Sequence, residues 1–126
     1  MGEVLRQALE PVLRDIGVSG APVPDIRDED WADDPGTESA MLWSRDGSGA
    51  GVSVIVAQSA PDRVAHVADQ VQEWVIEELW RRAPTNWPVC PRHPDSHPLV
   101  ATVRGAAAVW VCPVDEAVVA PVGALV

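Results

Sequence analysis

Apolar residues near the start of the chain recur at helical spacing and predict an amphipathic helix. Its apolar face holds Val4, Leu5, Leu9, Val12, Leu13 and Ile16, and its other face holds Glu3, Arg6, Gln7, Glu10 and Arg14. Pro11 lacks a backbone donor, so we expect it to kink this helix or to begin a second one. Gly17 is expected to end the helix.

Residues 19–57 show the pattern of loops and short strands. The segment 19–39 is rich in Pro, Gly and Asp and predicts a loop, with a short edge strand near 23–26. "AMLW" (40–43) and "GVSVIVA" (51–57) then predict two strands joined by a glycine-rich hairpin turn. The turn matches neither GxGxxG nor a P-loop, and Ser48 lacks the setting of a nucleophile elbow.

The segment 59–83 carries the strongest helical pattern of the chain. Ser59 with Asp62 fits a capping box, Pro61 suits the first turn, and Pro84 is expected to stop the helix. Its apolar stripe contains Val64, Val67, Ala68, Val71, Trp74, Val75 and Leu79, and we expect Asp69, Gln72, Glu73 and Glu77 to face solvent. His66 lies beside the stripe and is expected to be a surface histidine. Arg81 and Arg82 suit the negative end of the helix dipole.

The remaining residues predict a small β module. "LVATV" (99–103) and "AVWVC" (108–112) flank a turn at Arg104-Gly105, and "AVVAPVGAL" (117–125) offers a third strand. The element order predicts an α+β fold: N-terminal helix, β-hairpin, long amphipathic helix, small β module. We expect residues 1–84 to form the body and 85–126 the β module packed on it. This helix–strands–helix order resembles bacterial secretion chaperones at the level of the fold only.

The net charge of the chain excludes some classes of binding partner. Nine basic and nineteen acidic residues give a net charge of −10, which argues against nucleic acid or an anionic membrane. A basic protein is the expected partner, and a homodimer is left open. Every basic residue is Arg, which fits a GC-rich bacterial genome. The carboxylates between Asp25 and Asp34 are expected to form a solvated acidic loop, although a cation site or a recognition patch is the alternative.

The compartment follows from the lack of targeting patterns. Charges run through the N-terminal segment, and no apolar stretch approaches the length of about 20 residues that spans a membrane. We therefore expect a cytoplasmic protein. In that compartment its two cysteines are expected to be metal ligands or free thiols rather than a disulfide.

Metal-ligand residue types concentrate in the last third of the chain. "CPRH" (90–93) has the CxxH spacing of a zinc knuckle, in which both side chains point at one ion, and "CPVD" (112–115) repeats it with a carboxylate. Proline at the second position favours the tight turn. Two knuckles separated by a hairpin resemble a zinc ribbon, a generic class that covers only this part of the chain.

The ligand set is predicted to be Cys90, His93, His97 and Cys112 around zinc, which prefers nitrogen and sulfur. Asp115 is the competing ligand or an outer group that orients the others. Trp110 is expected to share a strand face with Cys112 and to shield its thiolate. Two buried cysteines and two loop histidines without any metal form the alternative.

Two functional classes follow from this cluster. The first is a non-enzymatic interaction, adaptor or chaperone-like module that is stabilised by one structural zinc. The second is a zinc- or thiol-dependent enzyme that uses the same residues with an open coordination position. No HExxH motif and no deaminase signature is present, and no Glu stands beside His93 or His97 as a general base, so the first class is favoured.

Overall fold

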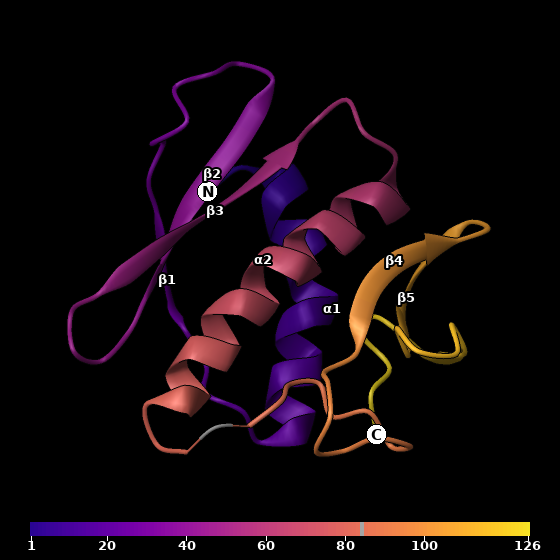
Figure 1. The fold of residues 1–126 in the computed structure, drawn as a ribbon. Coiled ribbons are helices and arrows are strands. Elements are labelled where there is room, and N and C mark those ends of the chain that lie inside the picture. Colours follow the sequence, from indigo (N-terminus) through magenta and orange to yellow (C-terminus); the bar gives the residue numbers. More distant parts are fainter. Residues whose placement is uncertain (84) are drawn as a thin grey trace.

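A computed structural model describes residues 1–83 and 85–126 of the chain (Figure 1). These residues form an α+β fold of two helices and two three-stranded antiparallel sheets, which confirms the predicted fold class. In chain order the elements are α1 (Glu3–Ser19), β1 (Asp25–Asp28), β2 (Thr37–Trp43), β3 (Gly49–Ile55), α2 (Ala60–Trp80), β4 (Val100–Arg104), β5 (Ala107–Val111) and β6 (Val118–Pro121).

Helix α1 buries the apolar face that its sequence predicts. Leu5, Leu9, Val12 and Ile16 are buried, and the helix runs on through Pro11 instead of stopping there. The expected end at Gly17 is wrong. Gly20 terminates the helix, because its φ of 71° lets its N–H turn back to the carbonyls of the last turn.

The first sheet has the order β1-β2-β3. Strands β2 and β3 form the predicted hairpin, in register from Thr37 opposite Ile55 to Trp43 opposite Gly49. Its turn contains Gly47 at a φ of 89°, a value that favours glycine. Strand β1 is the expected edge strand, but it begins at Asp25 rather than Val23.

Helix α2 begins as predicted, since the Ser59 hydroxyl accepts a hydrogen bond from the Asp62 N–H at 3.3 Å. It ends at Trp80, three residues before the expected end, and Arg81 lies at its C-cap. The predicted stop at Pro84 lies outside the described residues. Gln72 corrects the expectation of a solvent-facing side chain: it is buried, and its amide donates to backbone carbonyls of the following loop.

The second sheet has the order β4-β5-β6, with a register shift between Trp110 and Val111. Figure 1 shows α2 in the middle of the molecule, with β1–β3 on one side and β4–β5 on the other. A single buried cluster joins residues of both helices and both sheets with residues of the loop before β4. The metal-ligand candidates Cys90 and Cys112 belong to that cluster. Within the described residues, no helix has the length and apolar character needed to cross a bilayer.

Candidate metal centre

The loop between α2 and β4 carries three of the four predicted ligands. Its ends are held together by a bridge between Val89 and Pro98 and by a hydrogen bond from the Leu99 N–H to the Pro88 carbonyl at 2.9 Å. Inside it, the His93 N–H donates to the Cys90 carbonyl at 3.2 Å, which forms the tight turn expected of the CxxH spacing. The closed loop therefore turns Cys90 and His93 toward one point.

Cys112 comes from the connection between β5 and β6. The Glu116 N–H donates to the Cys112 carbonyl at 2.8 Å, and the Cys112 N–H donates to the Ala117 carbonyl at 2.9 Å. Glu116 adopts a positive φ of 61°, which closes this second turn. The three-stranded sheet thus presents one cysteine to the loop that carries the other ligands.

The four candidate side chains meet at one place. One ligand atom from each of Cys90, His93, His97 and Cys112 lies within 4.8 Å of the other three. The His93 Nδ1 lies 3.7 Å from the Cys90 Sγ, 3.6 Å from the Cys112 Sγ and 3.1 Å from the His97 Nε2. The Cys112 Sγ also lies 3.8 Å from the His97 Nε2.

These separations match the edges of a zinc tetrahedron. Typical Zn–S and Zn–N bonds with tetrahedral angles place sulfur and nitrogen ligands about 3.6 Å apart, and two nitrogen ligands about 3.3 Å apart. The distances between the candidate ligands lie within a few tenths of an ångström of these values. Four of the six separations between ligand atoms therefore have the lengths that a tetrahedral zinc ion requires.

Hydrogen bonding around the histidines favours the same interpretation. The His97 Nδ1 lies 3.0 Å from the Pro98 carbonyl, which can only accept, so this nitrogen carries the hydrogen and the Nε2 presents a lone pair. The His93 Nδ1 faces three polar neighbours but can donate a hydrogen to only one of them. A cation at the shared point would accept lone pairs from all four groups.

Burial and charge are consistent with a closed site. Cys90 and Cys112 are fully buried, and both histidines are half-buried. Two thiolates and two neutral imidazoles around a divalent ion sum to zero charge, which lowers the cost of burying them.

The indoles of Trp87 and Trp110 pack edge to face, with ring centroids 5.7 Å apart, in the same buried cluster. Strand β5 ends at Val111, so the expected strand face shared by Trp110 and Cys112 stays a prediction.

Asp115 has other partners. Its carboxylate forms an ion pair with Arg92 and accepts the Ala117 N–H at 2.9 Å. The backbone hydrogen bond from Ala117, together with Arg92, lowers the pKa of Asp115. Its oxygens are not among the four converging ligand atoms. Asp115 instead joins the second turn to the first through Arg92, next to the two cysteines.

Two buried polar residues hold segments around the site in place, Gln72 at the loop and Asp15 at Trp110, and neither was predicted from the sequence. Gln72 donates to the Trp87 carbonyl at 3.0 Å and to the Leu99 carbonyl at 2.5 Å. These two carbonyls stand on either side of residues 88–98, the ligand loop, which carries Cys90, His93 and His97. Asp15 accepts a hydrogen bond from the Trp110 indole at 2.9 Å. The signal for Asp15 was its place between Val12 and Ile16 on the apolar face of α1. The sequence signal for the burial of Gln72 was its position directly beside Val71, a member of the apolar stripe.

The other residues weighed from sequence do not join the cluster. His66 is half-buried on α2, and its Nδ1 has no hydrogen-bond partner among the described residues. In the acidic loop, Asp30 accepts the Asp33 N–H, and Asp34 accepts the Gly36 N–H and the Thr37 hydroxyl. These carboxylates order their own loop. They form no metal-ligand group within the described part of the chain.

The likeness to a zinc ribbon rests on the cluster and its small sheet. Three of the candidate ligands come from one loop and the fourth from the β5–β6 connection, whereas a ribbon divides them equally between two knuckles. Comparison of the chain with models of protein families, with curated proteins and with solved structures found no match.

Proposed function

We propose that Cys90, His93, His97 and Cys112 bind one zinc ion in a closed structural site, and that the chain is a non-enzymatic protein-interaction module. The observation that carries the proposal is the convergence of four ligand atoms from two separate segments within 4.8 Å. Two sulfur and two nitrogen donors at tetrahedral spacing are the set that zinc prefers in structural sites.

The ion would act as a cross-link. Residues 85–99 contain little regular structure, and only a few backbone hydrogen bonds hold them in place. A metal bound by His93, His97 and Cys112 fastens this loop to the second sheet, and it stabilises the folded state because the unfolded chain has no preformed site. Its binding energy therefore contributes to folding rather than to chemistry.

The donor count favours a structural role over catalysis. Four protein ligands fill a tetrahedral zinc site, whereas a catalytic zinc keeps one position for water or substrate. Asp115, the carboxylate next to the site, is occupied by Arg92 and the Ala117 N–H. These contacts argue against a free general base at the metal.

The partner is proposed from charge. A chain with a net charge of −10 attracts basic surfaces at long range, so we propose a basic protein partner. Reduced metal-binding cysteines fit the cytoplasm. A peptide array with matched basic and acidic sequences tests the partner, because preferential capture of acidic peptides in moderate salt would contradict it.

Metal analysis of the purified chain tests the site. We expect one zinc per chain, and a chelator should lower the melting temperature sharply. Cys112→Ser and His97→Ala should lose the ion or bind it more weakly. His66→Ala is the matched control, because this histidine does not belong to the converging group. A chain that is isolated without metal and melts unchanged after chelation overturns the proposal.

Cobalt substitution separates a closed site from an open one. A Cys₂His₂ cobalt site has a tetrahedral visible spectrum, and added azide should leave that spectrum unchanged when all four positions are filled. A spectral shift on azide addition would instead support the enzyme hypothesis.

A further inference from the structure

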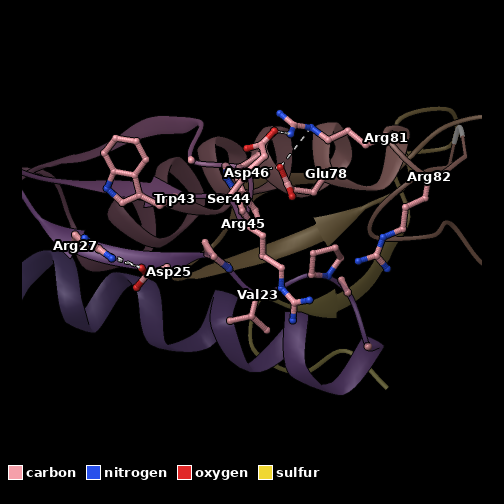
Figure 2. A pocket seen from close by; sticks show the side chains of 16 residues that line it. Val23, Asp25, Arg27, Trp43, Ser44, Arg45, Asp46, Glu78, Arg81 and Arg82 are labelled. Atoms are coloured by element: carbon pink, nitrogen blue, oxygen red, sulfur yellow. Dashed lines mark hydrogen bonds and ion pairs between the residues drawn. The ribbon is translucent and has the colours of Figure 1, made fainter.

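A second feature of the molecule, separate from the metal centre, is a groove at the end of the first sheet. It has a volume of about 1100 Å³. The segment that leads into β1, the turn after β2 and the C-terminal half of α2 form its walls, as Figure 2 shows. None of the four metal-ligand candidates lines it.

The groove concentrates positive charge in an acidic protein. Four of the nine basic residues of the chain line it: Arg27, Arg45, Arg81 and Arg82. Three carboxylates line it as well, namely Asp25, Asp46 and Glu78. The groove therefore carries a formal charge of +1, from four arginines and three acids, whereas the whole chain carries −10.

The carboxylates of the groove already have partners. Asp25 pairs with Arg27 at 3.1 Å, and Asp46 pairs with Arg81. Hydrogen bonds from the Ser48 hydroxyl and N–H, together with Arg81, lower the pKa of Asp46 to about 2. Glu78 accepts the Ser44 hydroxyl at 2.5 Å and lies 3.7 Å from Arg81. The internal pairs thus use two of the four arginines.

Arg45 and Arg82 are the remaining two. Within residues 1–83 and 85–126, neither guanidinium lies within 4.0 Å of a carboxylate or makes a side-chain hydrogen bond. In Figure 2 the two side chains extend from different elements toward the same part of the groove. Two planar guanidinium groups without internal partners provide the donors that carboxylates and phosphates bind.

Most of the remaining lining is apolar. Val23 is 67% exposed, and prolines stand on both sides of it in the wall of the groove. Trp43 is half-buried, and Trp74 is 4% exposed with an indole N–H that has no partner among the described residues. Such a surface favours a ligand that combines an apolar body with few polar groups.

We propose that this groove binds a small organic acid, whose compact carboxylate or phosphate head contacts Arg45 and Arg82 and whose apolar body packs on Val23. A volume of about 300–1,000 Å³ is typical of small-molecule pockets, and the groove, at about 1100 Å³, lies slightly above that range. The net charge of −10 repels nucleic acids and long acidic peptides, whereas two unpaired guanidiniums in one groove attract a single compact anion. The inference does not rest on the metal proposal.

Titration of the purified chain with small probes, monitored by NMR, tests the groove. Benzoate and phenyl phosphate carry both parts of the ligand, benzamide lacks the charge, and inorganic phosphate lacks the apolar body. We expect the first two to bind more tightly than the last two. The backbone and methyl resonances of Val23 should shift, while the indole resonances of Trp87 and Trp110, beside the metal centre, should not. A preference between benzoate and phenyl phosphate identifies the head group.

Variants of the arginines test which of them bind the anionic head of the probe. Arg45→Gln combined with Arg82→Gln should weaken binding of the better probe by about tenfold or more. Arg104→Gln removes the same charge from an exposed arginine outside the groove and should leave binding within about twofold. Equal binding of benzamide and benzoate, an unchanged affinity in the double variant, or binding of a hexaglutamate peptide without binding of either small anion overturns the proposal. Melting curves confirm that each variant folds.

Discussion

Asp15 is a buried carboxylate that joins α1 to the end of the chain. Its Oδ2 accepts the Trp110 indole N–H at 2.9 Å and the Gly123 N–H at 2.7 Å, and its Oδ1 accepts the Leu125 N–H at 3.0 Å. The half-exposed Arg14 supplies a positive charge at 3.2 Å. Because these donors come from segments about a hundred residues away, Asp15 fixes the C-terminal segment against the helix.

Replacing Asp15 should therefore be costly. Asp15→Ala leaves three donors without an acceptor, and we expect a loss of about 3 kcal/mol in the free energy of unfolding. Asp15→Asn should cost less, because one oxygen can keep the bonds to Trp110 and Gly123. Asp69→Ala on the exposed face of α2 is the control, with a change within about 0.5 kcal/mol. Urea denaturation measures all three, and equal stability of Asp15→Ala and Asp69→Ala would contradict this role.

The end of α1 shows how an element's boundary depends on single glycines. Gly17 lies inside the helix, and a Cβ there would meet no atom within 4 Å. Gly20 terminates the helix at a φ of 71°, where a side chain is strained. The two glycines are three residues apart in similar sequence surroundings, but they have opposite conformational requirements.

Substitution by alanine should change the free energy of unfolding in opposite directions at Gly17 and Gly20. Gly17→Ala should raise the free energy of unfolding by about 0.5–1 kcal/mol, because alanine favours the helix. Gly20→Ala should lower it by about 1 kcal/mol, because alanine resists the left-handed conformation. Thermal melting of the two variants beside the parent checks both signs. Stabilisation by Gly20→Ala would place the end of the helix elsewhere.

Helix α2 supports the ligand loop through Gln72. Gln72→Leu keeps the volume but leaves the carbonyls of Trp87 and Leu99 without donors, so we expect a loss of about 2 kcal/mol in the free energy of unfolding. Because those carbonyls flank the ligand loop, zinc affinity should fall as well. Glu73→Leu changes the exposed neighbour and should leave the metal in place. Competition with a chromophoric chelator measures the affinity, and unchanged affinity in Gln72→Leu would argue against this support.

At the scale of the whole molecule, the helices and both sheets share one core. Buried residues from α1, α2, β2, β3, the ligand loop and the second sheet belong to a single contiguous cluster. The sequence predicts a body of residues 1–84 with a β module of residues 85–126 packed on it, and this division stays a prediction. Buried residues of both parts belong to the cluster. If either the body or the β module unfolded alone, residues of both would therefore lose buried contacts.

The metal-loaded chain should unfold in one step. Far-UV circular dichroism, which reports mainly the two helices, and the fluorescence of Trp87 and Trp110 near the ligand loop should give the same midpoint in denaturant. Variants in which phenylalanine replaces the other four tryptophans restrict the fluorescence to that region. Two separate midpoints would show that the β module opens independently of the body.

Sequence patterns specified most of the elements and the members of the candidate site. Helical spacing predicted α1 and α2, the glycine-rich turn predicted the β2–β3 hairpin, and the spacing of Cys90, His93 and His97 indicated the cluster. These features follow from the periodicity of a backbone and from the reach of side chains within one turn, which are local properties. The burial of Gln72 was missed for the opposite reason, since its acceptors lie 15 and 27 residues away.

The sequence by itself thus determined the helices, the hairpin and the tight turn of Cys90 and His93, because each depends on neighbours along the chain. Only the tertiary structure decided that Cys112 meets the histidines while Asp115 pairs with Arg92, that Asp15 is buried beneath Trp110, and that four arginines line one groove. Each of those outcomes depends on segments far apart in sequence. Their approach is set by the packing of the shared core, which no local pattern encodes.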